Sequence, residues 1–220
     1  MIKLLFIIIF LFFNTNGNSI HIKNKLLIVK SHYIQNIPPW KFIKSSDGIS
    51  IYTRSVDGWS VNEYRAIFTI KAPIELVEKV LRDTKNQRKW SKNTILVKEI
   101  KRVSHDIFYT YSQTNAPWPA TDRDNVVHII YTYPTKNKIH IKIESKPNAF
   151  PKNKNFVRIE RMEGSWILEA SSNGTTKVTQ QALVDPGGST PKWLINSFLV
   201  NGPMRNLNNL KNYIEKSINF

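Results

Sequence analysis

Hydrophobic and polar residues alternate along most of residues 49–184, which is the pattern of strands with one buried face. The clearest case is 139–143, where isoleucines alternate with His140 and Lys142. Asn173-Gly174 favours a tight hairpin, and such a short connection requires antiparallel neighbours. The pattern therefore predicts one long antiparallel sheet, with strands over 49–54, 63–71, 95–100, 107–111, 126–133, 139–143, 157–161, 166–170 and 178–184.

Two other segments repeat apolar residues at helical spacing. The first begins at Ala72-Pro73, with proline in the first turn, and ends near Asp83-Thr84. The second runs from Pro191 to the end, with an expected kink at Gly202-Pro203 and one apolar stripe made of Leu207, Leu210, Ile214 and Ile218. A sheet that buries this stripe has an α+β architecture, and a single helix leaves room for an apolar tunnel beside it.

The start of the chain has the layout of a signal peptide. Lys3 precedes an unbroken apolar run over residues 4–13, and small and polar residues follow. The run has about ten residues, whereas a membrane-spanning helix needs roughly 20. We expect a signal peptide over 1–19, a basic leader over 20–38 and one ligand-binding domain over 39–220; a retained N-terminal anchor is the alternative.

The composition indicates an exported and strongly basic protein. The chain has no cysteine, which excludes disulfides and thiol nucleophiles and suits a bacterial envelope. The location expected is therefore secreted or periplasmic. Lys and Arg number 32 against 16 Asp and Glu, a formal charge of +16. Such a charge attracts an anionic membrane surface, although a solubilising coat is the alternative.

Other function classes find little support in the sequence. The aromatic residues lie in apolar alternating strands and not between Lys and Arg, which argues against nucleic-acid binding. No Gly-x-Ser-x-Gly motif is present, and the five histidines show no His-x-x-x-His spacing. We expect a monomer with no catalytic residue, no metal and no cofactor.

Four stretches of the chain together resemble the StAR-related lipid-transfer (START) domain in its bacterial single-domain form, with a match from about Pro39 to Ile214. These are the strand at 47–54, the segment Ala116-Pro117-Trp118-Pro119 leading to Asp122-Arg123-Asp124, and the stretches at 157–166 and 185–194. The resemblance implies a helix-grip fold, in which a curved antiparallel sheet wraps around a long C-terminal helix and encloses a hydrophobic tunnel. It implies that the protein binds one lipid or similar hydrophobic molecule and transfers it between membranes.

The resemblance also suggests which residues contact the ligand. Arg123 matches an arginine that several family members place inside the cavity. Ser112 stands where sterol-carrying relatives have the paired acid, so an anionic head group is the expected counter-charge; a rim pairing with Asp122 or Asp124 is the alternative. The other expected ligand contacts are Tyr109, Tyr111, Phe150, Trp193 and Phe198. Trp118, Trp166 and Trp193 either line the tunnel or fill the core.

Two further expectations follow from the resemblance. The loop at 146–155 and the C-terminal helix correspond to lid elements at the tunnel mouth, and Lys152 and Lys154 beside Phe150 are the expected membrane contacts. The alternative function is that of an enzyme of the helix-grip superfamily, a cyclase or hydrolase of small hydrophobic substrates. In that case His128 or Tyr111 would be the candidate acid–base residue.

Overall fold

The computed structural model describes residues 38–188, 195 and 197–218. The expected signal peptide and nearly all of the expected basic leader lie outside these residues, so both stay predictions. Within the described ranges, no helix combines the length and the apolar character needed to cross a bilayer.

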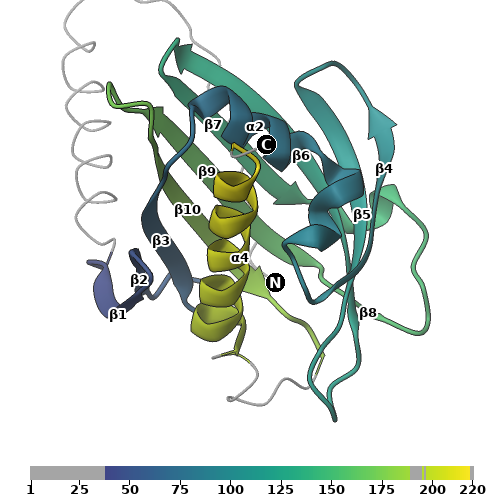
Figure 1. Ribbon diagram of the computed structural model, residues 1–220. Helices are drawn as coiled ribbons and strands as arrows, with labels where there is room; N and C mark the ends of the chain where they lie inside the picture. Colours follow the sequence, from purple (N-terminus) through teal and green to yellow (C-terminus); the bar gives the residue numbers. More distant parts are fainter. Residues whose placement is uncertain (1–37, 189–194, 196, 219–220) are drawn as a thin grey trace, which may run out of the picture. The chain divides into compact units, whose positions relative to one another are not determined.

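One curved sheet forms the body of the described domain (Figure 1). Its strand order is β1-β2-β3-β10-β9-β7-β6-β5-β4, with antiparallel pairing along this whole path, and short β8 pairs in parallel with β6. The strands are β1 (Lys41–Ser46), β2 (Ile49–Arg54), β3 (Glu63–Ile70), β4 (Thr94–Arg102), β5 (Ile107–Thr114), β6 (Arg123–Thr135), β7 (Lys138–Ser145), β8 (Val157–Arg158), β9 (Arg161–Ala170) and β10 (Thr176–Asp185).

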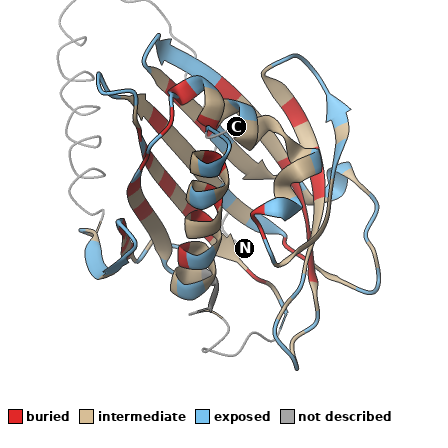
Figure 2. Cartoon of the chain, viewed as in Figure 1, coloured by how far each residue is buried: buried red, intermediate tan, exposed pale blue. Residues whose placement is uncertain are grey.

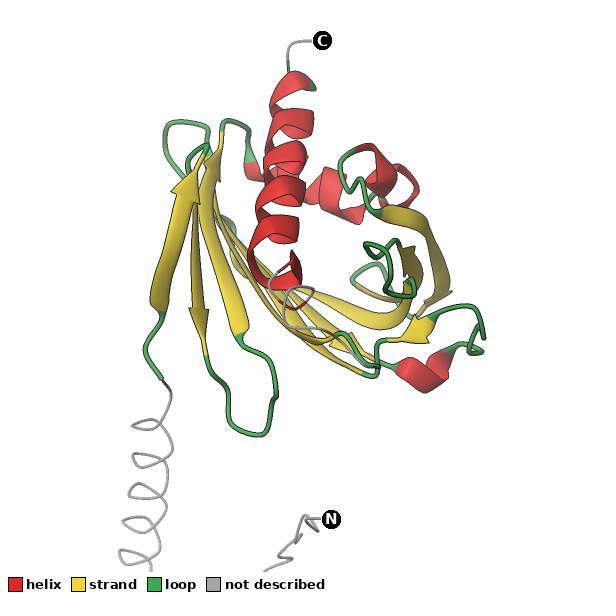
Figure 3. Ribbon diagram, turned by 90° about the horizontal axis from the view of Figure 1, so that it is seen from below, coloured by secondary structure: helices red, strands yellow, loops and turns green. Residues whose placement is uncertain are grey.

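The helices lie mainly on the concave side of this sheet. Figure 3 shows the strands curving around the C-terminal helix, with the shorter helices beside it. The helical elements are α2 (Ile74–Arg82), the 3-10 helices η1 (Thr84–Lys89) and η2 (Pro147–Ala149), the π-helical turn η3 (Ser197–Asn201) and α4 (Gly202–Lys216). The predicted α+β, helix-grip architecture is therefore confirmed.

Helix α4 packs its apolar stripe against the sheet. Met204, Leu207, Leu210 and Ile214 are buried and join the core formed with inward-facing strand residues (Figure 2). Ile218, which we expected on the same stripe, is 46% exposed. The stripe ends one turn early because the helix itself ends at Lys216.

Two strands differ from the prediction for identifiable reasons. The sequence pattern missed β1, whose residues are almost all exposed and therefore show no alternation between buried and exposed positions. The strand expected over 157–161 is interrupted: β8 pairs with β6 for two residues, and Arg161 already begins β9, which pairs with β10 and β7. The η3 turn stands where we expected a kink, directly before Gly202.

Candidate functional site

A cavity of about 360 Å³ lies between the concave face of the sheet and the helices. Strand residues of alternating position point into it from seven neighbouring strands, β3, β10, β9, β7, β6, β5 and β4, while η1 and the first turns of α4 close the remaining sides. The volume is in the lower part of the range of about 300–1,000 Å³ typical of small-molecule sites. Its apolar wall includes Val97, Val127, Ile129, Ile141, Ile143, Met162, Trp166, Ala182 and Leu207.

The polar part of the wall is made of hydroxyl, amide and indole groups. These belong to Tyr64, Gln87, Trp90, Thr110, Ser112, Asn125, Gln180 and Asn206, among others. In the described part of the chain, no Asp, Glu, Lys, Arg or His borders the cavity. The cavity is therefore amphipathic but carries no formal charge.

The tyrosines Tyr64 and Tyr131 add no charge to the cavity wall. Burial raises the pKa of Tyr64 to about 12, against the opposing effect of its hydrogen bond with Gln180. Burial also raises the pKa of Tyr131, although the guanidinium of Arg82, 3.7 Å from its ring centroid, opposes this. Because a raised pKa favours the protonated phenol, both tyrosines are uncharged at neutral pH.

Arg123 is buried, as expected, but it does not border the cavity. Its guanidinium donates to the backbone carbonyls of Thr121, Pro186 and Gly187, the last two in the turn after β10. Burial lowers the pKa of Arg123, and the nearby carboxylate of Asp122 raises it. The guanidinium thus bonds to backbone carbonyls where we expected a ligand head group or an internal acid, and a role of Arg123 as a ligand contact stays a prediction.

Tyr111 and Phe150 also lie away from the cavity. Thr110 and Ser112 face it, so the strand alternation of β5 directs Tyr111 to the opposite face of the sheet. There Tyr111 is covered by Phe150, with ring centroids 4.7 Å apart. Tyr109 stacks on His128 at 4.4 Å on this same outer face.

A buried ion pair fixes the loop that covers this outer face. Arg158 donates to both carboxylate oxygens of Asp124, at 2.7 and 2.9 Å, and both side chains are almost inaccessible to solvent. The same guanidinium donates to the carbonyls of Pro147, Phe150 and Pro151. The loop at 146–155 is thus anchored to the outer face and does not border the cavity, contrary to its expected role as a lid.

The remaining expected site residues have mixed outcomes. Trp193 lies outside the described residues, and so does the side chain of Phe198. Ser112 and Trp166 border the cavity, whereas Trp118 is 90% exposed and neither lines it nor fills the core. His128 and Tyr111 both face away from the cavity, so the geometry does not favour the acid–base chemistry considered for them. No cluster able to hold a metal ion occurs among the described residues.

The polar residues of the wall, above all Asn125, Gln180 and Asn206, were not predicted from the sequence. A signal for Gln180 was present, since it alternates with Val178 and Ala182 at positions that face inward. A polar residue in the buried register of an apolar strand indicates either a buried hydrogen bond or a ligand contact. Asn125 and Asn206 had no comparable signal.

The comparisons with known proteins agree with this geometry. The family model described as the START domain matches residues 35–216. An uncharacterized protein of Pseudomonas aeruginosa is 34% identical over 177 residues, which cover 80% of this chain and 87% of that protein. The phosphatidylcholine transfer protein of Rattus norvegicus is 25% identical over 173 residues, which cover 74% of this chain and 78% of that protein.

A solved structure is similar over the same region. The crystal structure of the STAR-related lipid transfer protein from Xanthomonas axonopodis matches with a TM-score of 0.74 and 33% identity, covering 80% of this chain and 99% of that one. The family match spans most of the sequence and coincides with the sheet, the cavity and the C-terminal helix. The chain therefore belongs to the START domain family.

Proposed function

We propose that this protein binds one lipid or similar hydrophobic molecule in its cavity and carries it between membranes. The observation that carries the proposal is the cavity of about 360 Å³, walled by apolar side chains and closed by α4. Enclosing an acyl chain there removes apolar surface from water, which stabilises the complex by about 25 cal/mol for each Å² buried. The similarity to a phosphatidylcholine transfer protein supports a lipid as the ligand.

Native mass spectrometry of the full chain from its own host tests binding directly. We expect one bound molecule of lipid mass per protein, and loss of that mass in Ala182→Phe, which fills part of the cavity. Thr132→Phe, on the exposed face of β6, is the matched control and should keep the ligand. A folded wild-type protein that takes up no lipid from a broad panel would refute the proposal.

The transfer part of the proposal needs a mouth for the cavity, and we infer that it lies where two surface segments border the cavity. Gln87 and Asn93 border the cavity from one side, and Asn115 and Pro117 border it from the β5–β6 loop. The backbone N–H of Asn115 donates to the carbonyl of Asn93 at 2.8 Å, so the two segments adjoin.

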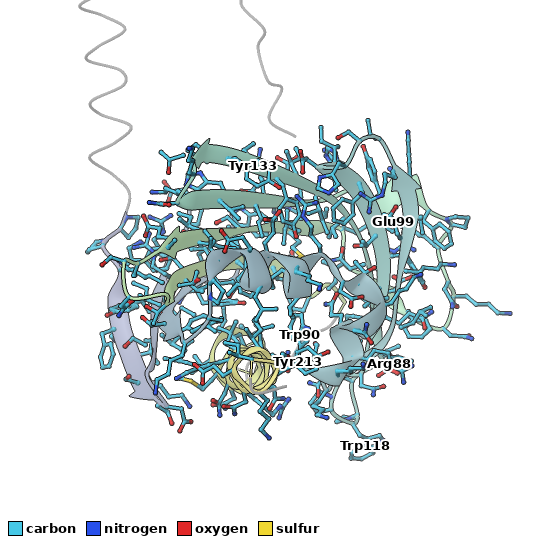
Figure 4. The ribbon with its side chains drawn as sticks, turned by 45° about the horizontal axis from the view of Figure 1, so that its top comes forward. Arg88, Trp90, Glu99, Trp118, Tyr133 and Tyr213 are labelled. Carbon is cyan, nitrogen blue, oxygen red and sulfur yellow. The ribbon has the colours of Figure 1, made fainter. Side chains whose placement is uncertain are left out.

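A membrane-docking surface is available at this place. Trp118, at the tip of the β5–β6 loop, projects from the molecule (Figure 4) and is 90% exposed. Exposed basic residues flank the other side of the mouth, namely Lys85, Arg88, Lys89 and Lys92. Tryptophan prefers the interfacial layer of a bilayer, and lysine and arginine are attracted to anionic lipids. We infer that this surface docks on the membrane, with the cavity mouth facing the lipids.

A further inference from the structure

The cavity extends along β6 from the inferred mouth into the core. Asn125, Val127, Ile129 and Tyr131 alternate along this strand, and all four border the cavity. Six residue steps of a strand cover about 20 Å. The strand starts after the β5–β6 loop, where the exposed Asn115 borders the cavity, whereas Tyr131 at the other end is only 5% exposed. The cavity therefore has a mouth end and a buried end.

The wall changes in character between these two ends. Near the mouth it is formed by amide and hydroxyl side chains, those of Asn93, Ser112, Thr114 and Asn115. At the buried end Ile129 pairs with Ile143, and Tyr131 pairs with Ile141, across β6 and β7. Gln180 is a polar exception at this end, and it shares a hydrogen bond with Tyr64. An acyl chain that lies along β6 with its terminus at the buried end therefore buries the most apolar surface.

The charge of the wall determines where an ionised head group can lie. Among the described residues, no side chain with a formal charge borders the cavity. A charged head group at the buried end would thus be removed from water without a counter-charge, which is strongly unfavourable. At the mouth the same head group stays in contact with water.

The segment at 84–93 brings positive charge to the mouth. Gln87 and Asn93 of this segment border the cavity. The segment contains no acidic residue, and its four basic residues are exposed and form no ion pair within the described chain. These residues, the η1 basic cluster, are Lys85, Arg88, Lys89 and Lys92. The cluster can therefore attract an anion beside the mouth without competition from a neighbouring carboxylate.

We propose that the ligand is a lipid with an anionic head group, that its acyl chain enters first, and that the head group stays at the mouth beside the η1 basic cluster. This inference rests on the proposed function. It assigns the counter-charge of the ligand to the surface at 84–93, whereas the sequence had suggested Arg123.

Two single-chain probes test the preference for an anionic head group. Oleoyl-lysophosphatidylglycerol is anionic, and oleoyl-lysophosphatidylcholine has the same chain with a zwitterionic head group. Titration calorimetry without vesicles, below the micelle concentration of both, separates ligand binding from membrane docking. At low salt we expect the anionic probe to bind about tenfold more tightly, since each exposed ion pair contributes up to about fivefold in affinity.

The salt dependence distinguishes the mouth from a buried site. Exposed charges are screened by salt far more than buried ones, so the preference should disappear at about 0.5 M salt. A preference that persists at that salt concentration would indicate a buried counter-charge and would overturn the inference.

Substitutions identify the basic residues responsible. Arg88→Gln with Lys89→Gln should bring the affinity for the anionic probe to within about twofold of that for the zwitterionic one, whose affinity stays unchanged. Lys152→Gln with Lys154→Gln removes the same charge from the loop at 146–155, which does not border the cavity, and should change neither affinity. An equal effect of the two double variants would overturn the inference, because only the overall charge would then matter.

Photo-cross-linking of the wild-type protein tests the orientation independently. Two oleate analogues carry a diazirine, one at the methyl end of the chain and the other next to the carboxylate. We expect the first to label 129–131 or 141–143, and the second to label 84–93 or 114–117. The reversed pattern, or equal affinities for the two lysophospholipids, would overturn the inference and leave lipid binding intact. Failure to bind any of these lipids would refute both the inference and the proposed function.

Discussion

At the scale of single residues, Arg123 is the residue whose observed contacts differ most from the predicted ones. Its guanidinium donates to backbone carbonyls of Thr121 and of the turn at Pro186 and Gly187, and it does not border the cavity. Arg123→Met removes these donors from buried carbonyls, so we expect the free energy of unfolding to fall by about 1–3 kcal/mol. Urea denaturation measures this, and the affinity for oleate should stay unchanged.

Arg161→Met is the control for Arg123→Met. Arg161 also donates to a backbone carbonyl, that of Gly58, but it lies at the exposed surface, so its loss should cost less than about 1 kcal/mol. Weakened oleate binding by an Arg123→Met protein of unchanged stability would instead return Arg123 to the ligand site.

At the scale of elements, the grip of the sheet on α4 depends on the apolar stripe of that helix. Leu210 is fully buried in the core. Leu210→Ala removes its packing and leaves a cavity, so we expect a loss of about 2–5 kcal/mol in the free energy of unfolding. Ile218→Ala, at an exposed position beyond the end of α4, should change it by no more than about 0.5 kcal/mol. If the denaturation curves of Leu210→Ala and Ile218→Ala coincided, this account of the helix would be contradicted.

At the scale of the whole molecule, the proposed docking surface lies beside the inferred cavity mouth. Trp118→Ser should slow lipid transfer between vesicles several-fold, because the exposed indole beside the mouth is lost. Arg88→Glu with Lys89→Glu should weaken association with anionic vesicles by on the order of fivefold for each charge, since each basic residue contributes about 1 kcal/mol. Vesicle co-sedimentation and a fluorescent-lipid transfer assay measure the two effects.

The expected lid loop supplies the control for these vesicle experiments. Lys152 and Lys154 lie on the loop that covers the outer face, and Lys152 pairs with Glu160 at 2.6 Å. Lys152→Glu with Lys154→Glu should therefore have the smaller effect, although it changes the charge by the same amount. A larger effect of this pair would place the docking surface on the loop at 146–155 and not at the cavity mouth.

The sequence by itself determined the architecture of this domain. Alternation such as that of 139–143 follows directly from one face of a strand being buried, and the stripe of α4 follows from helical spacing, so both are local consequences of burial. The motifs around Trp118, Arg123 and Asp185 then sufficed to identify the START domain. Strand β1 was not predicted, because it is exposed on both faces and therefore lacks an alternation of hydrophobic and polar residues.

Only the tertiary structure decided which side chains line the cavity. One face of β5 and β6 borders the cavity, and the other face carries the loop at 146–155, so burial alone does not reveal which face Tyr111 occupies. The pairing of Arg123 with carbonyls and the unpaired amide of Asn125 depend likewise on neighbours far apart in the chain. Both features involve residues far apart in the chain, so the local sequence pattern around Arg123 and Asn125 does not reveal them.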